Sequence, residues 1–508
     1  MWQKFSLYDF RVIAHYLGVL VLFLAVAQCV PFGVALVLGE WNPASRYLLG
    51  IGLALVVGSL LRMCLVTPGK LSPKQALAVT GFAWLVLALL AAIPMALSGH
   101  YGSYLDAVFE GMSSWTTTGA SLAQDLDHMS VADNTWRFTM QCIGGQGVVV
   151  IALSLGLFGR AVDSSLYSSE GRSEHVIPNI MQTTRFIVRF SAAFIVLGTV
   201  ILTGLCLFVG MEPLRAFFNG MWLAVASFNT GGMAAMSTGI LYYHSGLIEV
   251  VVMILILMGS INFTLHSEIW KGRLEHFFRD IEIRTLAIWL SVIVAAFVAT
   301  LCTANIYDSL SVLLRRAVFT VIAAFSSTGF QTISVNQMTT VVSSGALLII
   351  VFCMAVGGSA GSTTGGIKVL RVGILVKELV AYIKDLLAPA SARQVVTYYH
   401  VGRRPLNSDL VRANLAVFML YGVMFLITTI ATVMYGYDAA PALFESVSMV
   451  SNIGMSSGII QPGMPDMLKL LYIFDMWAGR LEFTTLIALI VSIVAMIPLF
   501  PYAKWLAK

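Results

Sequence analysis

The segment Ala107–Gly119, with the sequence AVFEGMSSWTTTG, decides how the rest of the chain is organised. It begins with Ala-x-Phe, continues as a short amphipathic stretch, and ends in hydroxyl side chains followed by a glycine. In this copy Phe109 stands ten residues before Gly119. Endings of the same kind recur at three later places: Phe228-Asn229-Thr230-Gly231-Gly232, Ser326-Ser327-Thr328-Gly329-Phe330 and Ser451-Asn452-Ile453-Gly454-Met455.

The recurrence also defines a repeated unit. Phe319 and Phe444 hold the position of Phe109, whereas the second copy is degenerate and has Met221 ten residues before Gly231. Each copy lies between apolar segments, and self-similarity at a regular period indicates a repeat architecture. We therefore expect four helix–pore-helix–helix units, preceded by two transmembrane helices in residues 1–70. The expected bounds of the units are 71–175, 176–280, 281–400 and 401–508.

The composition places the chain in a membrane. Of its 508 residues 58% are hydrophobic and 11% are charged, and the mean hydropathy is +0.87. An ordinary soluble domain carries about 25% charged residues, so a soluble enzyme, a disordered chain and a nucleic-acid binder are excluded. A helix needs about 20 apolar residues to cross a bilayer, which leaves room for roughly ten to twelve spans. The expected fold class is an all-α integral membrane protein.

The basic residues predict the orientation in the lipid bilayer. When the N-terminus and alternate loops are placed on one face, that face collects most of the 30 lysine and arginine residues. Cytoplasmic loops carry such an excess, so both termini are expected in the cytoplasm. The opposite face carries acids that either attract cations to the mouth of a pore or lie in a merely solvated loop: Glu110, Asp125, Asp127 and Asp133.

Cysteine and histidine give no sign of a metal or redox site. The six cysteines lie in different apolar stretches, and the eight histidines are equally scattered. Disulfide frameworks and zinc sites need clustered residues. No constellation of nucleophile, base and metal ligand is visible, so we expect neither a cofactor nor enzymatic activity.

The repeated endings have a chemical meaning if they lie inside the membrane. A short helix that stops there leaves carbonyls unpaired, which is tolerated only in buried protein or around a wet cavity. Four such ends that converge would direct carbonyls at one axis, where they replace the water shell of a monovalent cation. Glycine allows the backbone to turn its carbonyls inward at positive φ. A single Thr-Gly pair would indicate only a loop turn, but four equivalent pairs favour an ion site.

These features resemble the pore-forming subunits of the Trk/Ktr/HKT potassium transporter superfamily, closest to its TrkH type because of the two leading helices. The resemblance covers nearly the whole chain. Besides the four loops, it rests on the motifs Trp136-Arg137, Gly144-Gly145-Gln146-Gly147, the run from Gly357 to Lys368, and Gly479-Arg480-Leu481-Glu482. It implies four pseudo-repeats around one pore, potassium as the transported ion, and a homodimer in the bacterial cytoplasmic (inner) membrane. It also implies a cytosolic nucleotide-binding regulatory subunit of the TrkA type. The basic loops at 160–189, 271–284 and 393–404 are its expected docking places, unless they reflect membrane topology alone.

The resemblance further implies a selectivity filter in the four loops. Glycine at all four key positions matches potassium-permeable members, whereas sodium-selective plant relatives carry serine in the first. The fourth loop has Asn452 and Ile453 where the first loop has two threonines. We therefore expect it to supply carbonyls without a hydroxyl, and the selectivity for potassium over sodium to be modest. The expected ion-binding residues are Thr117, Thr118, Gly119, Asn229, Thr230, Gly231, Ser327, Thr328, Gly329, Asn452, Ile453 and Gly454.

A second group of residues is expected to gate the path. The run GGSAGSTTGGIK at 357–368 differs from a phosphate-binding loop, because Ile367 stands where that motif needs lysine and no strand precedes it. A small-residue helix-packing stretch is one reading, and a broken helix beneath the filter is the other. The resemblance makes the run an intramembrane gating loop, in which Thr364 replaces a usual glycine. The expected gate residues are Gly357, Gly358, Gly361, Ser362, Thr363, Thr364, Gly365, Gly366 and Arg480.

Arg480 lies inside the last apolar segment, where an ionisable residue is costly and usually functional. It is expected either to form a structural ion pair with Asp475 or Glu482, or to act as a positive barrier just inside the filter. The two roles are compatible.

Two other functions remain open at this stage. A secondary carrier would bind a small solute at broken helices near the midplane. Such carriers commonly show two inverted repeats and buried acid pairs, whereas this chain shows four repeats in one direction. A sodium-permeable member of the same family is the other alternative.

Overall fold

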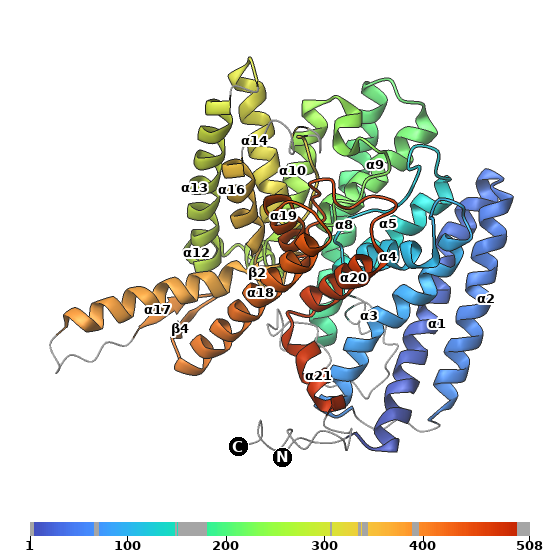
Figure 1. Cartoon of the computed structure of the whole chain (residues 1–508), viewed down its shortest axis with the longest axis horizontal. Helices are drawn as coiled ribbons and strands as arrows, with labels where there is room; N and C mark the ends of the chain where they lie inside the picture. The colour runs from blue at the N-terminus through green and yellow to red at the C-terminus, as the bar shows by residue number, and fades with distance from the viewer. Residues whose placement is uncertain are drawn as a thin grey trace.

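A computed structural model shows how the chain folds (Figure 1). The residues it describes are 5–65, 71–147, 150, 180–304, 307–333, 337, 344–388 and 396–494. Parts of the expected basic loops, 160–179 and 393–395, lie outside these residues. Residues 148–149, 151–159 and 495–508 also lie outside them.

Long helices dominate the described residues. Six of them are long and apolar enough to cross a bilayer: α1 (Leu7–Leu38), α2 (Trp41–Met63), α3 (Pro73–Ala96), α8 (Ile180–Phe208), α13 (Ile281–Ala304) and α18 (Ser408–Met434). Two bent pairs add to them: α10 (Gly246–Ser260) with α11 (Phe263–Trp270) at 99°, and α20 (Asp466–Arg480) with α21 (Thr484–Val494) at 113°. The leading helices α1 and α2 pack side by side at one edge of the molecule (Figure 1).

Shorter helices fill the centre and its margins. They are α4 (Tyr104–Trp115), α5 (Val131–Gln146), α9 (Pro213–Phe228), the 3₁₀ helix η1 (Gly239–Tyr243), α12 (Leu274–Arg279), α14 (Leu310–Phe325), α16 (Ser344–Ala355), α17 (Val369–Leu387) and α19 (Ala439–Val450). Two small sheets depart from an all-helical fold. β1 (Val356–Gly357) pairs in parallel with β2 (Ile367–Lys368), and β3 (Thr397–Tyr399) pairs antiparallel with β4 (Arg403–Pro405).

Composition leaves room for roughly ten to twelve spans in the whole chain, a number that the described residues alone do not test. These give six spans, or eight if each bent pair crosses once. Other helices in the described residues are shorter: α5 has 16 residues and α16 has 12. At 1.5 Å per residue, 16 residues extend about 24 Å, less than the roughly 30 Å of a hydrocarbon core.

Local sequence explains where several of these helices begin. Ser6 and Asp9 form a reciprocal capping box at the start of α1, and Ser72 and Gln75 form another at α3. Ser103 accepts a hydrogen bond from the Asp106 N–H and so caps the short helix α4. Such caps satisfy N–H groups that a helix leaves unpaired at its first turn. The short helix therefore starts at a defined residue, which fixes where it ends.

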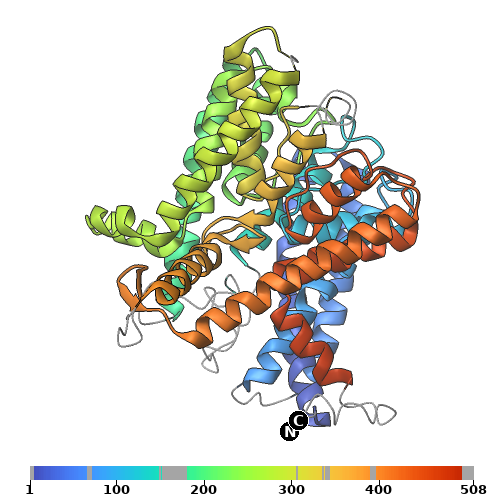
Figure 2. The ribbon, with the colours of Figure 1, turned by 60° about the vertical axis from the view of Figure 1, so that its left-hand side comes forward.

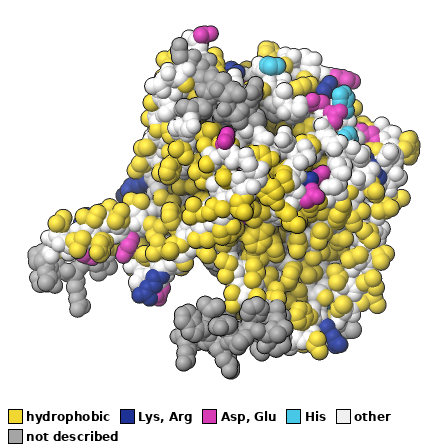
Figure 3. Space-filling view, in the orientation of Figure 1, with side chains coloured by type: hydrophobic (Ala, Val, Ile, Leu, Met, Phe, Trp, Pro, Cys, Tyr) yellow, Lys and Arg dark blue, Asp and Glu magenta, His cyan; other side chains and the backbone are white. Residues whose placement is uncertain are grey.

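The surface of the described residues fits a bilayer. Figure 3 shows a wide belt of hydrophobic side chains across the molecule, with Asp, Glu and His side chains gathered at the upper right. Large apolar residues on the long helices are exposed, for example Val37 and Leu60. In water such a surface would be unstable. The chain is an integral membrane protein.

Two of the acids expected at an outer mouth are instead buried in ion pairs. Glu110 accepts a hydrogen bond from Nε of Arg137 at 2.8 Å, and both side chains are fully buried. Asp133 accepts from Arg46 at 2.9 Å and from the Tyr47 hydroxyl at 2.7 Å. These acids therefore hold helices together and do not collect cations from solution.

The other two acids lie in the outer loop. Asp127 accepts hydrogen bonds from the Ser237 hydroxyl at 2.6 Å and from its N–H at 2.9 Å, and these bonds lower the pKa of Asp127. A hydrogen bond from His128 lowers the pKa of the exposed Asp125 carboxyl in the same way. Both carboxylates are therefore negative at neutral pH.

We predict that Arg137→Met destabilises the protein by about 3–5 kcal/mol, because it leaves the buried Glu110 carboxylate without its charged partner. The measurement is thermal unfolding of the purified protein in detergent. Arg412→Met is the matched control, since the side chains of Arg412 and its partner Asp409 are 82% and 81% exposed. Equal melting temperatures for the two variants would contradict the structural role of the pair.

Candidate ion-binding site

Four short helices, α4, α9, α14 and α19, end in the same hydrogen-bonded turn. At the end of α4 the Thr118 N–H donates to the Ser113 carbonyl at 2.9 Å, and the Thr117 N–H donates to the Ser114 carbonyl at 3.2 Å. The corresponding donors at the other three ends are Gly231 and Thr230, Thr328 and Ser327, and Ile453 and Asn452. This pair of bonds defines the Schellman motif. The helix-end carbonyls that accept these bonds, which the sequence suggested would be unpaired, are therefore satisfied.

The turn places a polar residue in a left-handed conformation at each helix end. The φ angles are 57° at Thr117, 50° at Thr230, 52° at Ser327 and 55° at Asn452. Glycine is the usual residue at this position, and another residue costs roughly 1–2 kcal/mol there. The side chains explain why glycine is absent, since each of the four makes a polar contact described below.

The structure corrects the sequence register of the second loop by one residue. Gly232, and not Gly231, has the positive φ that Gly119, Gly329 and Gly454 share. The hydrogen-bonded turns agree, because Gly231 N–H makes the bond that Thr118 makes in the first loop. The loop equivalent to residues 117–119 is therefore 230–232, and Asn229 stands one position before it.

The four loops form one closed ring. A Cβ atom on Gly119 would overlap the carbonyl oxygen of Gly231, and one on Gly232 would overlap the carbonyl oxygen of Thr328. In the same way Gly329 abuts the carbonyl of Ile453, and Gly454 abuts that of Thr118. Each loop thus presses its glycine on the carbonyl of the next, in cyclic order. The sequence-predicted loop residues are brought together around a single axis.

One side of the ring, which we call the outer side after the orientation expected from the sequence, opens into a cavity of about 480 Å³. The four ring glycines all line it, together with side chains such as Ser121, Gln331 and Ser456. Gln331 bridges the third and fourth loops by donating to the Ser456 carbonyl at 3.0 Å. The ring is therefore the floor of an outer vestibule.

At the position that Thr118 holds in the first loop, a hydroxyl group is present in every second loop around the ring. Thr118 forms a 2.8 Å hydrogen bond with the Thr116 hydroxyl, and Thr328 forms a 2.7 Å bond with the Ser326 hydroxyl. Gly231 and Ile453 occupy the same position in the other two loops and have no hydroxyl. Because the loops follow in cyclic order, the two loops with a hydroxyl at this position lie opposite each other.

An irregular segment closes the inner side of the ring. It runs from the end of α16 through the β1–β2 pair to the start of α17, so the expected broken helix is present at residues 356–368. The Thr363 hydroxyl lies 2.8 Å from that of Thr230, and the Gly365 N–H donates to the Ser327 hydroxyl at 2.7 Å. Two of the left-handed polar residues therefore anchor this segment, which we call the intramembrane loop.

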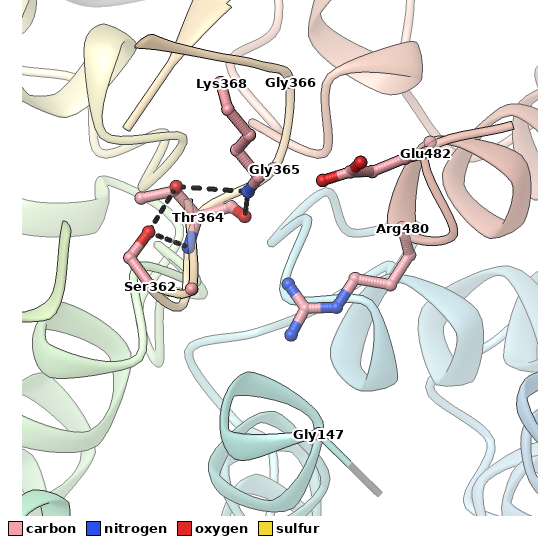
Figure 4. Close-up of a pocket in the computed structure, with 10 residues that line it drawn as sticks. Gly147, Ser362, Thr364, Gly365, Gly366, Lys368, Arg480 and Glu482 are labelled. Atoms are coloured by element: carbon pink, nitrogen blue, oxygen red, sulfur yellow. Dashed lines mark hydrogen bonds between the residues drawn. The ribbon is translucent and has the colours of Figure 1, made fainter. Parts of the chain in front are cut away.

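Arg480 reaches the same place from the end of α20. Its guanidinium donates to the Gly144 carbonyl at 2.6 Å, the Thr363 carbonyl at 2.9 Å and the Thr117 hydroxyl at 3.3 Å. Figure 4 shows Arg480 extending between the Ser362–Gly366 segment and the helix end at Gly147. The remaining left-handed residue, Asn452, donates to the Met476 carbonyl of the same helix at 2.7 Å.

The acids considered as partners of Arg480 bind other groups. Glu482 forms an ion pair with Arg371. Asp475 accepts a hydrogen bond from the Thr428 hydroxyl at 2.8 Å. Arg480 is thus positioned by backbone carbonyls and by the Thr117 hydroxyl, with its guanidinium 5.6 Å from the ring centre of Trp84.

Only a small cavity of about 30 Å³ lies between these groups. Its lining includes the predicted gate residues Gly361, Ser362, Thr364, Gly365, Gly366 and Arg480. Lys368, Gly147 and Glu482 also line it (Figure 4). None of the three was an expected gate residue, although Glu482 was a candidate partner of Arg480. The space on this side of the ring is therefore much smaller than the 480 Å³ cavity on the other side.

One group of metal-ligating side chains, Asp280, Glu282 and His400, comes together among the described residues. All three are buried, and their ligand atoms lie within 4.8 Å of one another. The Glu282 carboxylate accepts from the Ala360 N–H of the intramembrane loop at 2.6 Å, and His400 lies 3.1 Å from Asp280. Sequence analysis missed this group because 118 residues separate Glu282 from His400.

Known proteins resemble this chain over most of its length. A family model described as TrkH, cation transport protein, matches residues 54–496. An uncharacterized cation transporter of Methanocaldococcus jannaschii is 31% identical over 96% of both chains, and the Trk system potassium uptake protein TrkH of Escherichia coli is 27% identical over 94% of this chain and 98% of its own. The crystal structure of the potassium transporter TrkH from Vibrio parahaemolyticus has the same fold, with a TM-score of 0.80, 22% identity, and coverage of 96% of this chain and 99% of that chain.

The corrected register makes a test by substitution possible. We predict that Gly232→Ala strongly lowers the melting temperature, because its Cβ meets the Thr328 carbonyl and its φ of 58° disfavours alanine. Gly231→Ala should be milder, since its Cβ meets the flexible side chain of Gln141. Thermal unfolding of both purified variants measures the difference. A greater loss for Gly231→Ala would restore the original register.

Proposed function

This chain belongs to the TrkH family of cation transport proteins, and we propose that it carries potassium ions across the cytoplasmic membrane through the ring of four loops. The observation that carries this proposal is the closed cyclic contact between each loop glycine and the next loop's carbonyl. A ring of backbone carbonyls can replace the hydration shell of a monovalent cation. The names of the Escherichia coli and Vibrio parahaemolyticus relatives support potassium as the ion.

The filter would consist of residues 117–119, 230–232, 327–329 and 452–454. Its carbonyls come from loops whose helix ends are already closed by hydrogen bonds, so the loops are held in place before an ion arrives. The hydroxyls of Thr118 and Thr328 are engaged with neighbouring hydroxyls. We therefore assign ion binding chiefly to carbonyl oxygens, with modest preference for potassium.

The membrane potential supplies the driving force. With the interior negative, each 100 mV favours entry of one positive charge by about 2.3 kcal/mol. An open selective path can therefore accumulate potassium without chemical catalysis by this chain. Transport, and not an enzymatic reaction, is the activity we propose.

The gate would be the intramembrane loop together with Arg480. Both lie directly beneath the filter, since Thr363 contacts Thr230 and Arg480 contacts Thr117. A guanidinium at this place repels a cation that leaves the filter. Movement of the loop would release both the steric block and the contacts that orient Arg480.

The assembly follows from the resemblance. We propose four pseudo-repeats, a homodimer with both termini in the cytoplasm, and a TrkA-type nucleotide-binding subunit on the cytoplasmic face. α1 begins and α21 ends at the same end of the molecule, which supports a common side for the termini (Figures 1 and 2). No nucleic acid and no further cofactor enters this proposal.

The ring also favours a filter over the alternating binding site of a secondary carrier. Its four glycines press on backbone carbonyls, so it cannot widen without parting these contacts. If the protein were a carrier for another solute, it would take up an organic solute and show no rubidium flux. A sodium-permeable transporter would instead show equal rubidium and sodium fluxes.

We expect Gly119→Ser to lower the ratio of rubidium to sodium flux by about tenfold, which corresponds to about 1.4 kcal/mol. The added side chain meets the Gly231 carbonyl and displaces a filter oxygen. Isotope uptake into proteoliposomes with an imposed potential measures both ions. Gly422→Ser is the control, because a Cβ there meets nothing within 4 Å. An unchanged ratio in folded Gly119→Ser would remove this loop from the filter.

Arg480→Ala should raise rubidium uptake by roughly tenfold. The reason is that it removes a positive charge that repels the ion, here taken as about 8 Å away in a medium of effective dielectric constant about 30. Arg480→Lys keeps the charge and should stay close to the wild-type rate. Lys384→Ala, an exposed base on α17, controls for the general loss of positive charge. Unchanged or lower uptake by Arg480→Ala at normal protein levels would exclude the barrier role.

A further inference from the structure

A second inner cavity lies on the cytoplasmic side of the intramembrane loop as we orient it. Its volume is about 580 Å³, and it is bordered by α17, α18 and the β3–β4 hairpin, which Figure 1 shows at the same side of the molecule. Three bases line it, Lys368, Arg371 and Arg404, against one acid, Glu482. This excess of positive charge disfavours a potassium path and favours an anion.

The backbone adds to the positive character of this cavity. α17 is 19 residues long and begins at its wall, where Leu370 and Arg371 in the first turn line the space. The helix has no side-chain cap at Lys368. The first N–H of the helix, on Val369, donates to the Gly358 carbonyl at 3.1 Å. The N-terminal end of a helix also carries a partial positive charge, which favours an anion.

A buried amide in the lining of this cavity has an unsatisfied hydrogen-bond donor. Asn414 lines it and is 3% exposed. Its Oδ1 accepts from Nη1 of Arg371 at 2.9 Å, whereas its Nδ2 has no hydrogen-bond partner among the described residues. Leaving a buried donor without an acceptor is energetically unfavourable. Asn414 and Arg371 both line the cavity, so an acceptor-rich ligand seated there would lie close to the amide and the guanidinium.

We propose that this cavity binds a phosphate group through Arg371, Asn414, Lys368 and Arg404. Arginine matches the geometry of phosphate oxygens, and phosphate offers several acceptors at once. The phosphate belongs either to the headgroup of an anionic lipid or to a free phosphate in the cytoplasm. Glu482 remains paired with Arg371 and holds the guanidinium in place.

The same cavity touches the proposed gate. Ala360 of the intramembrane loop lines it, and Lys368 donates to the Thr364 carbonyl within that loop. A phosphate that attracts Lys368 competes with this bond and changes the support of the loop. This regulatory consequence rests on the proposed transport function, whereas the binding site itself does not.

The binding test compares variants of the full-length purified protein. Asn414→Asp keeps an oxygen for Arg371 but replaces the orphan donor with a negative charge, and Arg404→Gln removes an exposed base from the hairpin. Arg412→Gln is the control on α18, because its side chain is 82% exposed and it does not line the cavity. Equilibrium dialysis with radioactive inorganic phosphate measures binding directly. We expect at least about tenfold weaker binding in Asn414→Asp, weaker binding in Arg404→Gln, and no change in Arg412→Gln.

A second arm distinguishes the two sources of phosphate. Native mass spectrometry of protein extracted from vesicles of phosphatidylcholine and phosphatidylglycerol measures retained anionic lipid. Lipid retention lost in Asn414→Asp supports a headgroup site, and phosphate binding without retention supports a free ligand. The proposal is overturned if the wild type binds no inorganic phosphate and retains no more phosphatidylglycerol than Asn414→Asp.

Transport is read separately, by rubidium uptake into vesicles with and without phosphatidylglycerol or internal phosphate. A response in the wild type that Asn414→Asp loses supports regulation of the gate. If the wild type binds phosphate but uptake never responds, the regulatory step fails and the site stands. If no variant transports rubidium yet binding follows the prediction, the proposed function fails and the site again stands.

Discussion

The structure depends on how a membrane-embedded chain satisfies its backbone where four helices stop. An unpaired carbonyl or N–H costs several kcal/mol in hydrocarbon. The same Schellman turn closes all four ends, at the expense of left-handed φ angles at Thr117, Thr230, Ser327 and Asn452. The turn returns the chain as a tight loop, and four tight loops can approach one another closely enough to form a ring.

The four left-handed residues also connect the ring to what lies beneath it. Glycine would relieve the strain but would remove the contacts to Arg480, Thr363, Gly365 and Met476. The strain is therefore maintained by tertiary contacts that reach the intramembrane loop and α20. A change in either element acts on the ring through these side chains, and this is the physical route by which the proposed gate would act on the proposed filter. The buried pair of Glu110 and Arg137 braces α4 from the outer side.

Much of this architecture could be predicted from the sequence. Composition required a membrane, the fourfold endings indicated the loops, and the Gly357–Lys368 run indicated a broken helix, because these signals are local. The mistaken expectations arose because each of them relied on local sequence alone. A Gly-Gly pair at 231–232 fits two registers, and only the hydrogen bonds choose between them. The acids Glu110 and Asp133 were expected in the outer loop, since a distant arginine partner leaves no mark on local sequence.

The sequence by itself determined the class of protein, the position of each loop and the residue types near the path, because hydrophobicity and glycine spacing act over short distances. Tertiary structure alone decided the cyclic order of the loops, the carbonyl contacts of Arg480, and the cavity that joins Arg371 to Asn414. Each of these joins residues far apart in the chain. Their energies depend on distance and direction in space, which separation along the chain does not specify.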